Sequence, residues 1–184
     1  MKITYEYLEE KSACITCKNW FKEHFPEGGE YQYVLDKLAE INKADWASWL
    51  IDKAGRVEAV FEIDGDLKSE TSIFFAGSIK IKGFLSAKFI LAGCGIEAGD
   101  GIKADYGIKA GCGIEAGCGI KAGCGIKAGD GIEAGCGIEA GDDFGIYAGL
   151  RIRISKKAIY ALVVAKEMPK NIVTGIFKAL GGEQ

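Results

Sequence analysis

The spacing of hydrophobic residues changes near residue 56. Before that point, apolar residues recur at intervals of three and four, which is typical of one face of an amphipathic helix. The clearest run comprises Tyr31, Val34, Leu35, Leu38 and Ile41. A second helix is predicted over 45–53, with Trp46 and Trp49 on one side and Gly55 just past its end. These helices are too short to be stable alone, so a small helical cap module is predicted over 1–56.

From residue 57 the pattern becomes that of β-strands and then repeats every six residues. The large apolar residues at this interval are Phe84, Ile90, Ile96, Ile102, Ile108, Ile114, Ile120, Ile126, Ile132 and Ile138. A short fixed period predicts a solenoid, because each unit buries its apolar face only by stacking on neighbours. Each unit is interpreted as a short strand, Ile-(Glu/Lys)-Ala, followed by a Gly-x-Gly corner whose glycines permit positive φ.

Two coil sizes are compatible with the repeat. An 18-residue, three-sided coil stacks like charges, whereas a 12-residue, two-sided coil stacks mostly opposite charges. The like-charge stacks of the first are Glu97, Glu115 and Glu133; Lys103 and Lys121; and Lys109 and Lys127. Charge pairing favours the two-sided coil, and room for the Ile side chains favours the three-sided one. The three-sided form is favoured and the two-sided form stays open. Segregated like charge would indicate a binding surface.

The fold class is therefore α+β, mainly β: a helical cap module over 1–56, a parallel β-solenoid over 57–154 and a C-terminal capping segment over 155–184. The non-repetitive tail, which contains AIYALVVA and NIVTGIF, is expected to close the open end as edge strands or a helix.

Composition narrows the function classes. The net charge of −3 gives no support for direct nucleic-acid binding. The N-terminus lacks the apolar core of a signal peptide, and no stretch is long enough for a membrane helix. Five of the seven cysteines occupy repeat positions, which indicates reduced thiols in a cytoplasm rather than a disulfide framework.

Candidate chemistry is sparse. Cys14 and Cys17 form a Cys-x-x-Cys without a second pair, so they are interpreted as ordinary buried cysteines rather than a metal or redox site. The single histidine, His24, lies outside the repeat and is interpreted as structural or surface-exposed. No phosphate-binding loop or nucleophile motif is present. No enzyme activity, metal or cofactor is expected. Trp46 and Trp49, if exposed, would serve as protein-binding hot spots.

The segment NWFKEHFPEGGEYQYVLDKLAEINKADWASWL, residues 19–50, resembles a helical module of small proteins from bacteriophages and prophages. The similarity rests on Trp20-Phe21, Phe25-Pro26, Gly28-Gly29, Tyr31, Val34-Leu35, Leu38 and Trp46-Ala47-x-Trp49-Leu50. Such modules are joined to Ala-Gly-x-Gly-Ile-x repeats like those at 92–142. The resemblance implies a non-enzymatic inhibitor of a host defence complex, similar to anti-CRISPR proteins, in the host bacterial cytoplasm.

The expected partner is a host protein or nucleoprotein complex, such as a CRISPR effector, with no direct nucleic-acid contact and no membrane. The candidate binding residues are Glu97, Glu115, Glu133, Lys103, Lys109, Lys121, Lys127, Trp46 and Trp49. One alternative is a self-assembling structural solenoid that forms homo-oligomers. A weaker alternative is a relative of hexapeptide-repeat acyltransferases, which would need a histidine that the repeat lacks.

Overall fold

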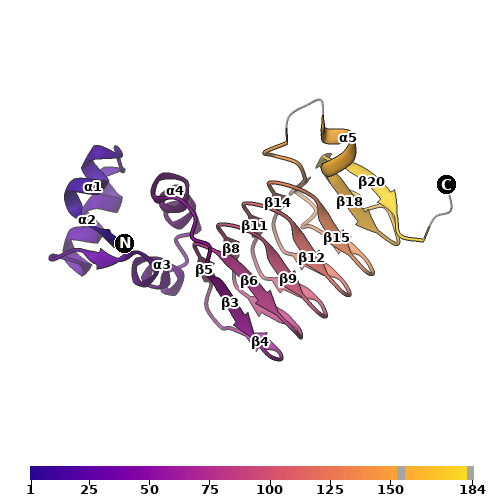
Figure 1. The fold of residues 1–184 in the computed structure, drawn as a ribbon, viewed down its shortest axis with the longest axis horizontal. Helices are drawn as coiled ribbons and strands as arrows, with labels where there is room; N and C mark the ends of the chain where they lie inside the picture. The colour runs from indigo at the N-terminus through magenta and orange to yellow at the C-terminus, as the bar shows by residue number, and fades with distance from the viewer. Residues whose placement is uncertain (153–155, 182–184) are drawn as a thin grey trace.

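The structure, a computed structural model, describes residues 1–152 and 156–181; it consists of a helical module followed by a parallel β-solenoid (Figure 1). The helical module contains α1 (Tyr5–Glu10), α2 (Ile15–His24), α3 (Tyr31–Glu40) and α4 (Ala44–Ala54). The strands β1 (Lys2–Ile3) and β2 (Gly29–Glu30) pair antiparallel within the module. The predicted helices over 31–41 and 45–53 are confirmed as α3 and α4.

Three parallel sheets form the sides of the solenoid, and we name each by its outer surface. The Glu sheet contains β3 (Val60–Ile63), β6 (Ser78–Ile81), β9 (Ile96–Ala98), β12 (Ile114–Ala116), β15 (Ile132–Ala134), β18 (Leu162–Ala165) and β20 (Ile176–Ala179). The Lys sheet contains β4 (Leu67–Lys68), β7 (Leu85–Ala87), β10 (Ile102–Ala104), β13 (Ile120–Ala122) and β16 (Ile138–Glu139). The covered sheet contains β5 (Ile73–Phe75), β8 (Ile90–Ala92), β11 (Ile108–Ala110), β14 (Ile126–Ala128), β17 (Ile146–Tyr147) and β19 (Ile172–Thr174).

The register between coils settles the coil size. Ile102 pairs with Ile120, and Ile114 pairs with Ile132, so one turn takes 18 residues and has three sides. The two-sided coil that charge pairing favoured is wrong. A stacked like-charge pair costs about 0.2–1 kcal/mol, whereas burying one isoleucine side chain contributes about 1.5–3 kcal/mol. Room for three columns of isoleucine therefore outweighs the charge pattern.

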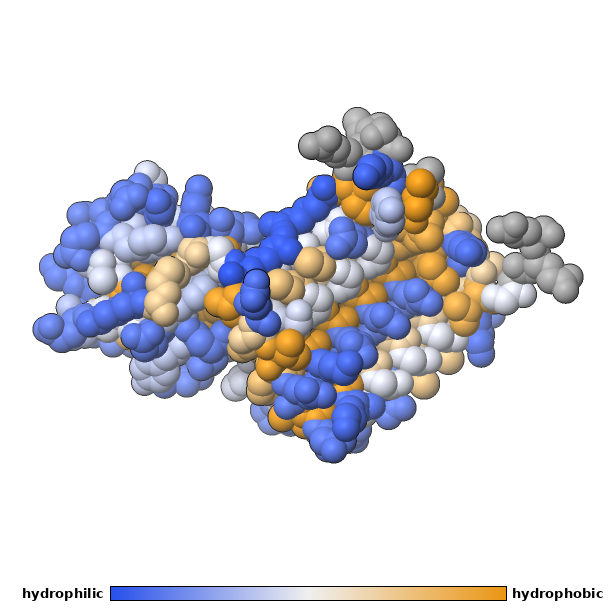
Figure 2. Space-filling view, in the orientation of Figure 1, coloured by the Kyte–Doolittle hydropathy of each residue, from blue (hydrophilic) through white to orange (hydrophobic). Residues whose placement is uncertain are grey.

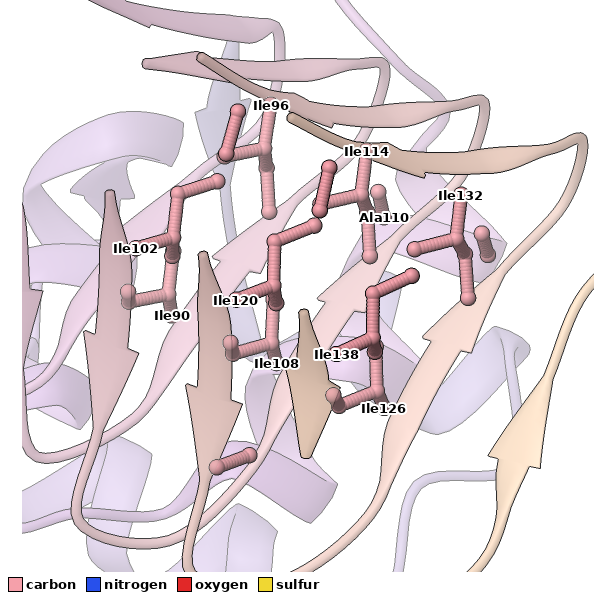
Figure 3. Packing of buried hydrophobic residues seen from close by; sticks show 14 of the residues in the cluster. Ile90, Ile96, Ile102, Ile108, Ala110, Ile114, Ile120, Ile126, Ile132 and Ile138 are labelled. Atoms are coloured by element: carbon pink, nitrogen blue, oxygen red, sulfur yellow. The ribbon is translucent and has the colours of Figure 1, made fainter. Parts of the chain in front are cut away.

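The core of the solenoid consists of isoleucine columns inside the three sheets (Figure 3). Ile90, Ile108 and Ile126 form the column of the covered sheet, and each is at most 1% exposed. Every Ala two residues further along each strand also faces inward. The strand pattern buried–exposed–buried follows from the two-residue periodicity of side chains in a strand.

The first glycine of each Gly-x-Gly corner is required by close packing and not by positive φ. A Cβ added to Gly117 would lie 1.9 Å from the carbonyl oxygen of Gly99 in the preceding coil. Among the described residues, the glycines with positive φ are Gly28, Gly55, Gly65, Gly149, Gly175 and Gly181, which lie outside the regular repeat. The prediction of left-handed corners was therefore wrong, because the corners turn with ordinary dihedral angles and need space instead.

The repeat also begins differently from its sequence alignment. Leu85, rather than Phe84, pairs with Ile102 and faces the core, so the coil that contains Leu85 is one residue short. Phe84 is half-buried, and its ring lies 3.0 Å from the position of a Cβ on Gly101. At the other end, Ile126 pairs with Ile146, 20 residues further on instead of 18, so this coil has two extra residues, which lie in the loop between β16 and β17.

The helical module covers the outer surface of β5 and β8. Phe74 and Leu91 point away from the solenoid core and are buried with the helices in a second hydrophobic cluster. Gln32 of α3 continues the hydrogen bonding of the edge strand β5, since its Nε2 donates to the Phe74 carbonyl (2.7 Å) and its Oε1 accepts from the Ala76 N–H (3.3 Å). The side-chain amide of Gln32 thus makes the two hydrogen bonds that a peptide group of a further strand would make with β5.

The tail adds strands to the same solenoid. β18 pairs with β15, β20 pairs with β18, and β19 pairs with β17. A short helix, α5 (Lys157–Tyr160), precedes β18 and lies beside it in Figure 1. The predicted boundary between solenoid and capping segment, at residues 154 and 155, lies outside the described residues.

Candidate binding surfaces

The outer surface of the Glu sheet carries a row of stacked carboxylates, which we call the acidic ladder. Glu115 pairs in register with Glu97 on one side and Glu133 on the other, and all three side chains are exposed. Glu97 forms an ion pair with Lys80 at 3.2 Å. Glu115 has a like charge on both sides, about 4.8 Å away, which is the spacing between strands.

A groove runs along this surface. Its volume is about 570 Å³, and the three residues of the acidic ladder are among those that line it. Apolar residues border the two ends of the row: Val60 on β3 at the first coil, and Ile159 and Tyr160 of α5 near the last. Ile159 is 63% exposed and Tyr160 is 55% exposed, so both side chains are free to contact another molecule. Figure 2 shows the alternating hydrophilic and hydrophobic rows that cross the face formed by β3 to β15.

The outer surface of the Lys sheet has the opposite charge. Lys103 and Lys121 stack in register and are exposed, and we call this pair the basic ladder. Lys121 also forms an ion pair with Glu139 of the next coil at 2.8 Å. The groove here has a volume of about 740 Å³, and Met168 at its C-terminal end is 68% exposed.

The lysines of the covered sheet do not form a free ladder. Lys109 stacks on Lys127, but it is half-buried, and its Nζ bonds to the Ser48 hydroxyl of α4. Lys127 instead lies over the Tyr147 ring, 5.4 Å from its centroid. Lys109 and Lys127 are equivalent in the repeat, but the helical module gives their side chains different surroundings.

Trp46 and Trp49 are half-buried and pack against the hydrophobic cluster of the helical module. The Trp46 ring meets the Trp20 ring edge-on at 6.0 Å, and Lys43 Nζ lies 5.0 Å from its centroid. Both indoles therefore belong to the packing between helices, with one side left open to solvent.

Cys14 and Cys17 form a disulfide. The predictions that they are buried and reduced were wrong: Cys14 is exposed, and it caps the N-terminus of α2 while Cys17 lies in the first turn. This arrangement brings their Cα atoms to 5.2 Å, within the range that a disulfide spans. The five cysteines of the repeat are free, and two of them, Cys118 and Cys136, are exposed.

His24 is exposed; its ring stacks on Trp20, and its Nδ1 lies 2.8 Å from the Trp20 carbonyl oxygen. Over residues 1–152 and 156–181, no group of three or more His, Cys, Asp or Glu side chains is arranged to hold a metal ion. Within the same ranges, every helix is too short or too polar to cross a membrane.

Two features of these surfaces were absent from the sequence prediction. The exposed Ile159 and Tyr160, which line the groove of the Glu sheet, were predicted to be part of a closing segment, because AIYALVVA has the composition of a buried strand. The contact of Arg56 with the repeat was also missed; its Nη1 donates to Cys112 Sγ at 2.9 Å across 56 residues of chain. The sequence did contain one signal for this contact: arginine occurs only three times, which sets Arg56 apart from the many lysines.

The fold and these surfaces define the chain as a parallel β-solenoid with an N-terminal helical module and charged, grooved sides. Residues 1–56 match the family model of the YdhT N-terminal domain, so the helical module is similar to that domain. No curated protein matches the chain, and no solved structure matches it. The match covers the helical module and does not extend into the solenoid.

Proposed function

We propose that this protein is a non-enzymatic binding protein whose Glu sheet docks on a basic surface of a host protein or nucleoprotein complex in the bacterial cytoplasm. The observation that carries the proposal is the acidic ladder. Its like charges repel one another in the isolated protein, and a cationic partner would remove that repulsion. A rigid, stacked scaffold also loses little conformational freedom on binding, which favours affinity.

The groove supports the same proposal. Exposed apolar side chains beside a charged surface anchor a partner by burying apolar area, while the charges orient it. Ile159 and Tyr160 would supply the anchors, and Glu97, Glu115 and Glu133 would set orientation and association rate. The sharpest form of the proposal is an anti-CRISPR-like inhibitor, in which the protein covers a basic surface of a CRISPR effector. That form rests on the resemblance of residues 19–50 to phage modules.

The test begins with an affinity pull-down of the tagged protein from host lysate, with the bound chains identified by mass spectrometry. The decisive arm uses a triple variant, Glu97→Lys, Glu115→Lys and Glu133→Lys. A matched control reverses three exposed carboxylates of the helical module: Glu9→Lys, Glu10→Lys and Glu23→Lys.

Stoichiometric recovery of one complex by the wild type and the control, together with its loss from the triple variant, would support the proposal. A nuclease assay on a recovered CRISPR effector would then test inhibition directly. Equal recovery by the triple variant would overturn the assignment to the Glu sheet.

A second candidate function, self-assembly, is favoured by the ends of the solenoid. β3 and β4 at the first coil, and β19 and β20 at the last, are edge strands of their sheets. Val60, Val173 and Ile176 at these ends are 53%, 58% and 47% exposed. Exposed apolar edges favour pairing between chains. Sedimentation velocity across a wide concentration range tests this, because a constant monomer coefficient would exclude it.

A further inference from the structure

The corner between the covered sheet and the Glu sheet gathers cations from three distant parts of the chain. A cavity of about 270 Å³ lies there, and Arg56, Lys109 and Arg151 all line it. Arg56 follows α4, Lys109 is on β11, and Arg151 follows β17. The chain contains 20 lysines but only three arginines, and both arginines within the described residues meet at this cavity.

The two guanidinium side chains lie over successive coils. Arg56 Cζ is 3.3 Å from the position of a Cβ on Gly111, and Arg151 Cδ is 3.0 Å from that on Gly129. Gly111 and Gly129 occupy the same corner of neighbouring coils, about 4.8 Å apart. The corner glycines thus leave the space in which both side chains lie.

The backbone around each cation is anchored. Tyr31 donates its hydroxyl hydrogen to the Gly55 carbonyl (2.9 Å), immediately before Arg56, and the Arg151 N–H donates to the Gly129 carbonyl (3.0 Å). Lys109 is a residue of the sheet, and its ammonium bonds to Ser48. The backbone at Arg56 and Arg151 and the ammonium of Lys109 are therefore held in place before any ligand binds.

The positive charge at this corner is not neutralised by direct pairing. Among residues 1–152 and 156–181, no carboxylate forms an ion pair with Arg56, Lys109 or Arg151. Among the described residues, one acidic residue, Asp52, lines the cavity, and a second, Asp130, lies with Arg151 in the adjoining pocket. Three cations beside two carboxylates still leave an excess of positive charge.

We propose that this cavity binds a small phosphate monoester, whose phosphate is held by Arg56 and Arg151, with Lys109 as the third positive charge. Arginine presents a planar fork of donors that matches phosphate oxygens, and two forks on neighbouring coils suit a dianion with three terminal oxygens. The side chains of Ile51 and Leu91 border the cavity beside the cations, which suits a small organic group on the ester oxygen.

The test is a titration of the ¹⁵N-labelled full chain with inorganic phosphate and with phenyl phosphate, followed by NMR. Sodium chloride at equal ionic strength and sodium acetate are the comparison salts. The expected result is a saturable shift of the Gly93 and Gly111 amides with both phosphates, tighter for phenyl phosphate. Arg56→Gln and Arg151→Gln should each weaken binding about tenfold or more, since each removes a charged hydrogen-bond donor.

Two controls keep the result specific. Lys103→Gln removes a cation of the basic ladder on another side of the solenoid and should leave the affinity unchanged. Arg56→Lys keeps the charge and removes the fork, so it should weaken binding while preserving the fold. Any of three results would overturn the proposal. These are shifts that do not saturate, the same shifts with sodium chloride, and shifts that Arg56→Gln and Arg151→Gln leave unchanged.

Cys112 offers an independent readout because Arg56 contacts its thiol. An anion bound beside Arg56 should slow alkylation of Cys112 by iodoacetamide, since negative charge nearby disfavours the thiolate. Cys118 is at another corner and should react at the same rate with and without phosphate. Equal effects on both thiols would count against a site at this corner.

Discussion

At the scale of single residues, Tyr31 shows how one buried polar group joins two elements. Its side chain is 5% exposed, and its hydroxyl donates to the Gly55 carbonyl at the end of α4. Burial raises the pKa of this hydroxyl far above its ordinary value. The neutral form is therefore the one that the fold requires.

Because the unfolded chain ionises Tyr31 near pH 10 and the folded chain does not, the free energy of unfolding should fall as pH rises above about 10. Tyr31→Phe should remove part of this alkaline dependence and cost about 1 kcal/mol at pH 7 through the lost hydrogen bond. Urea unfolding between pH 7 and pH 11 measures both effects. Tyr33→Phe is the matched control, since Tyr33 is 54% exposed; an unchanged alkaline slope in Tyr31→Phe would contradict the assignment.

The acidic ladder gives a second prediction at this scale. Glu115→Lys replaces two like-charge contacts by two opposite ones, so it should raise the free energy of unfolding by about 0.5–1 kcal/mol at low salt. Glu139→Lys, which breaks the ion pair with Lys121, should lower it. Denaturation in low and high salt measures the difference, which should shrink as salt screens the charges. Destabilisation by Glu115→Lys would show that the ladder is not repulsive.

At the scale of elements, the two glycines of a corner differ in what they tolerate. Gly135→Ala places a Cβ 1.9 Å from the Gly117 carbonyl oxygen and should destabilise the protein by about 2 kcal/mol or more. Gly137→Ala meets no atom within 4 Å and should be neutral or raise stability by up to about 1 kcal/mol. Thermal unfolding of the two variants separates the effects. Equal losses would mean that both glycines are needed for backbone freedom.

The edge strand β5 gives a further prediction at the scale of elements. Gln32→Ala leaves the Phe74 carbonyl and the Ala76 N–H without their side-chain partner and should cost about 1–3 kcal/mol. Glu40→Ala, at an exposed position of the same helix, is the control. Hydrogen exchange should speed up at Ala76 in the first variant only. Unchanged exchange there would remove the capping role.

The elements also show what the sequence could and could not predict. The repeat predicted the strands, their inward Ile and Ala, and the stacked Glu rows, because a six-residue period constrains every coil in the same way. It could not predict that Leu85 replaces Phe84 in the core, since a coil one residue short interrupts the period. The Arg56–Cys112 contact and the burial of Lys109 against Ser48 depend on how the helical module sits on the solenoid. No local pattern encodes that placement.

At the scale of the whole molecule, each coil contacts mainly the coils before and after it. Stability should therefore vary along the axis, as in other repeat proteins. Hydrogen exchange should be slowest in β9 to β14, which have a paired strand on both sides, and fastest in β19 and β20. Mass spectrometry after timed labelling measures this gradient. Uniform protection along the chain would instead indicate one cooperative unit.

The 18-residue turn also governs how the protein can change over evolution. Insertion or loss of a full turn lengthens or shortens the solenoid and leaves each side with its own charge. Loss of a single six-residue unit preserves the core but turns every later coil by one side. Deletion of residues 117–122, for example, would move Glu133 onto the column of Lys109 and convert a repulsive stack into an attractive one. Deletions or duplications of one unit thus redistribute surface charge without touching the hydrophobic interior, so the charge on each side can change while the fold stays the same.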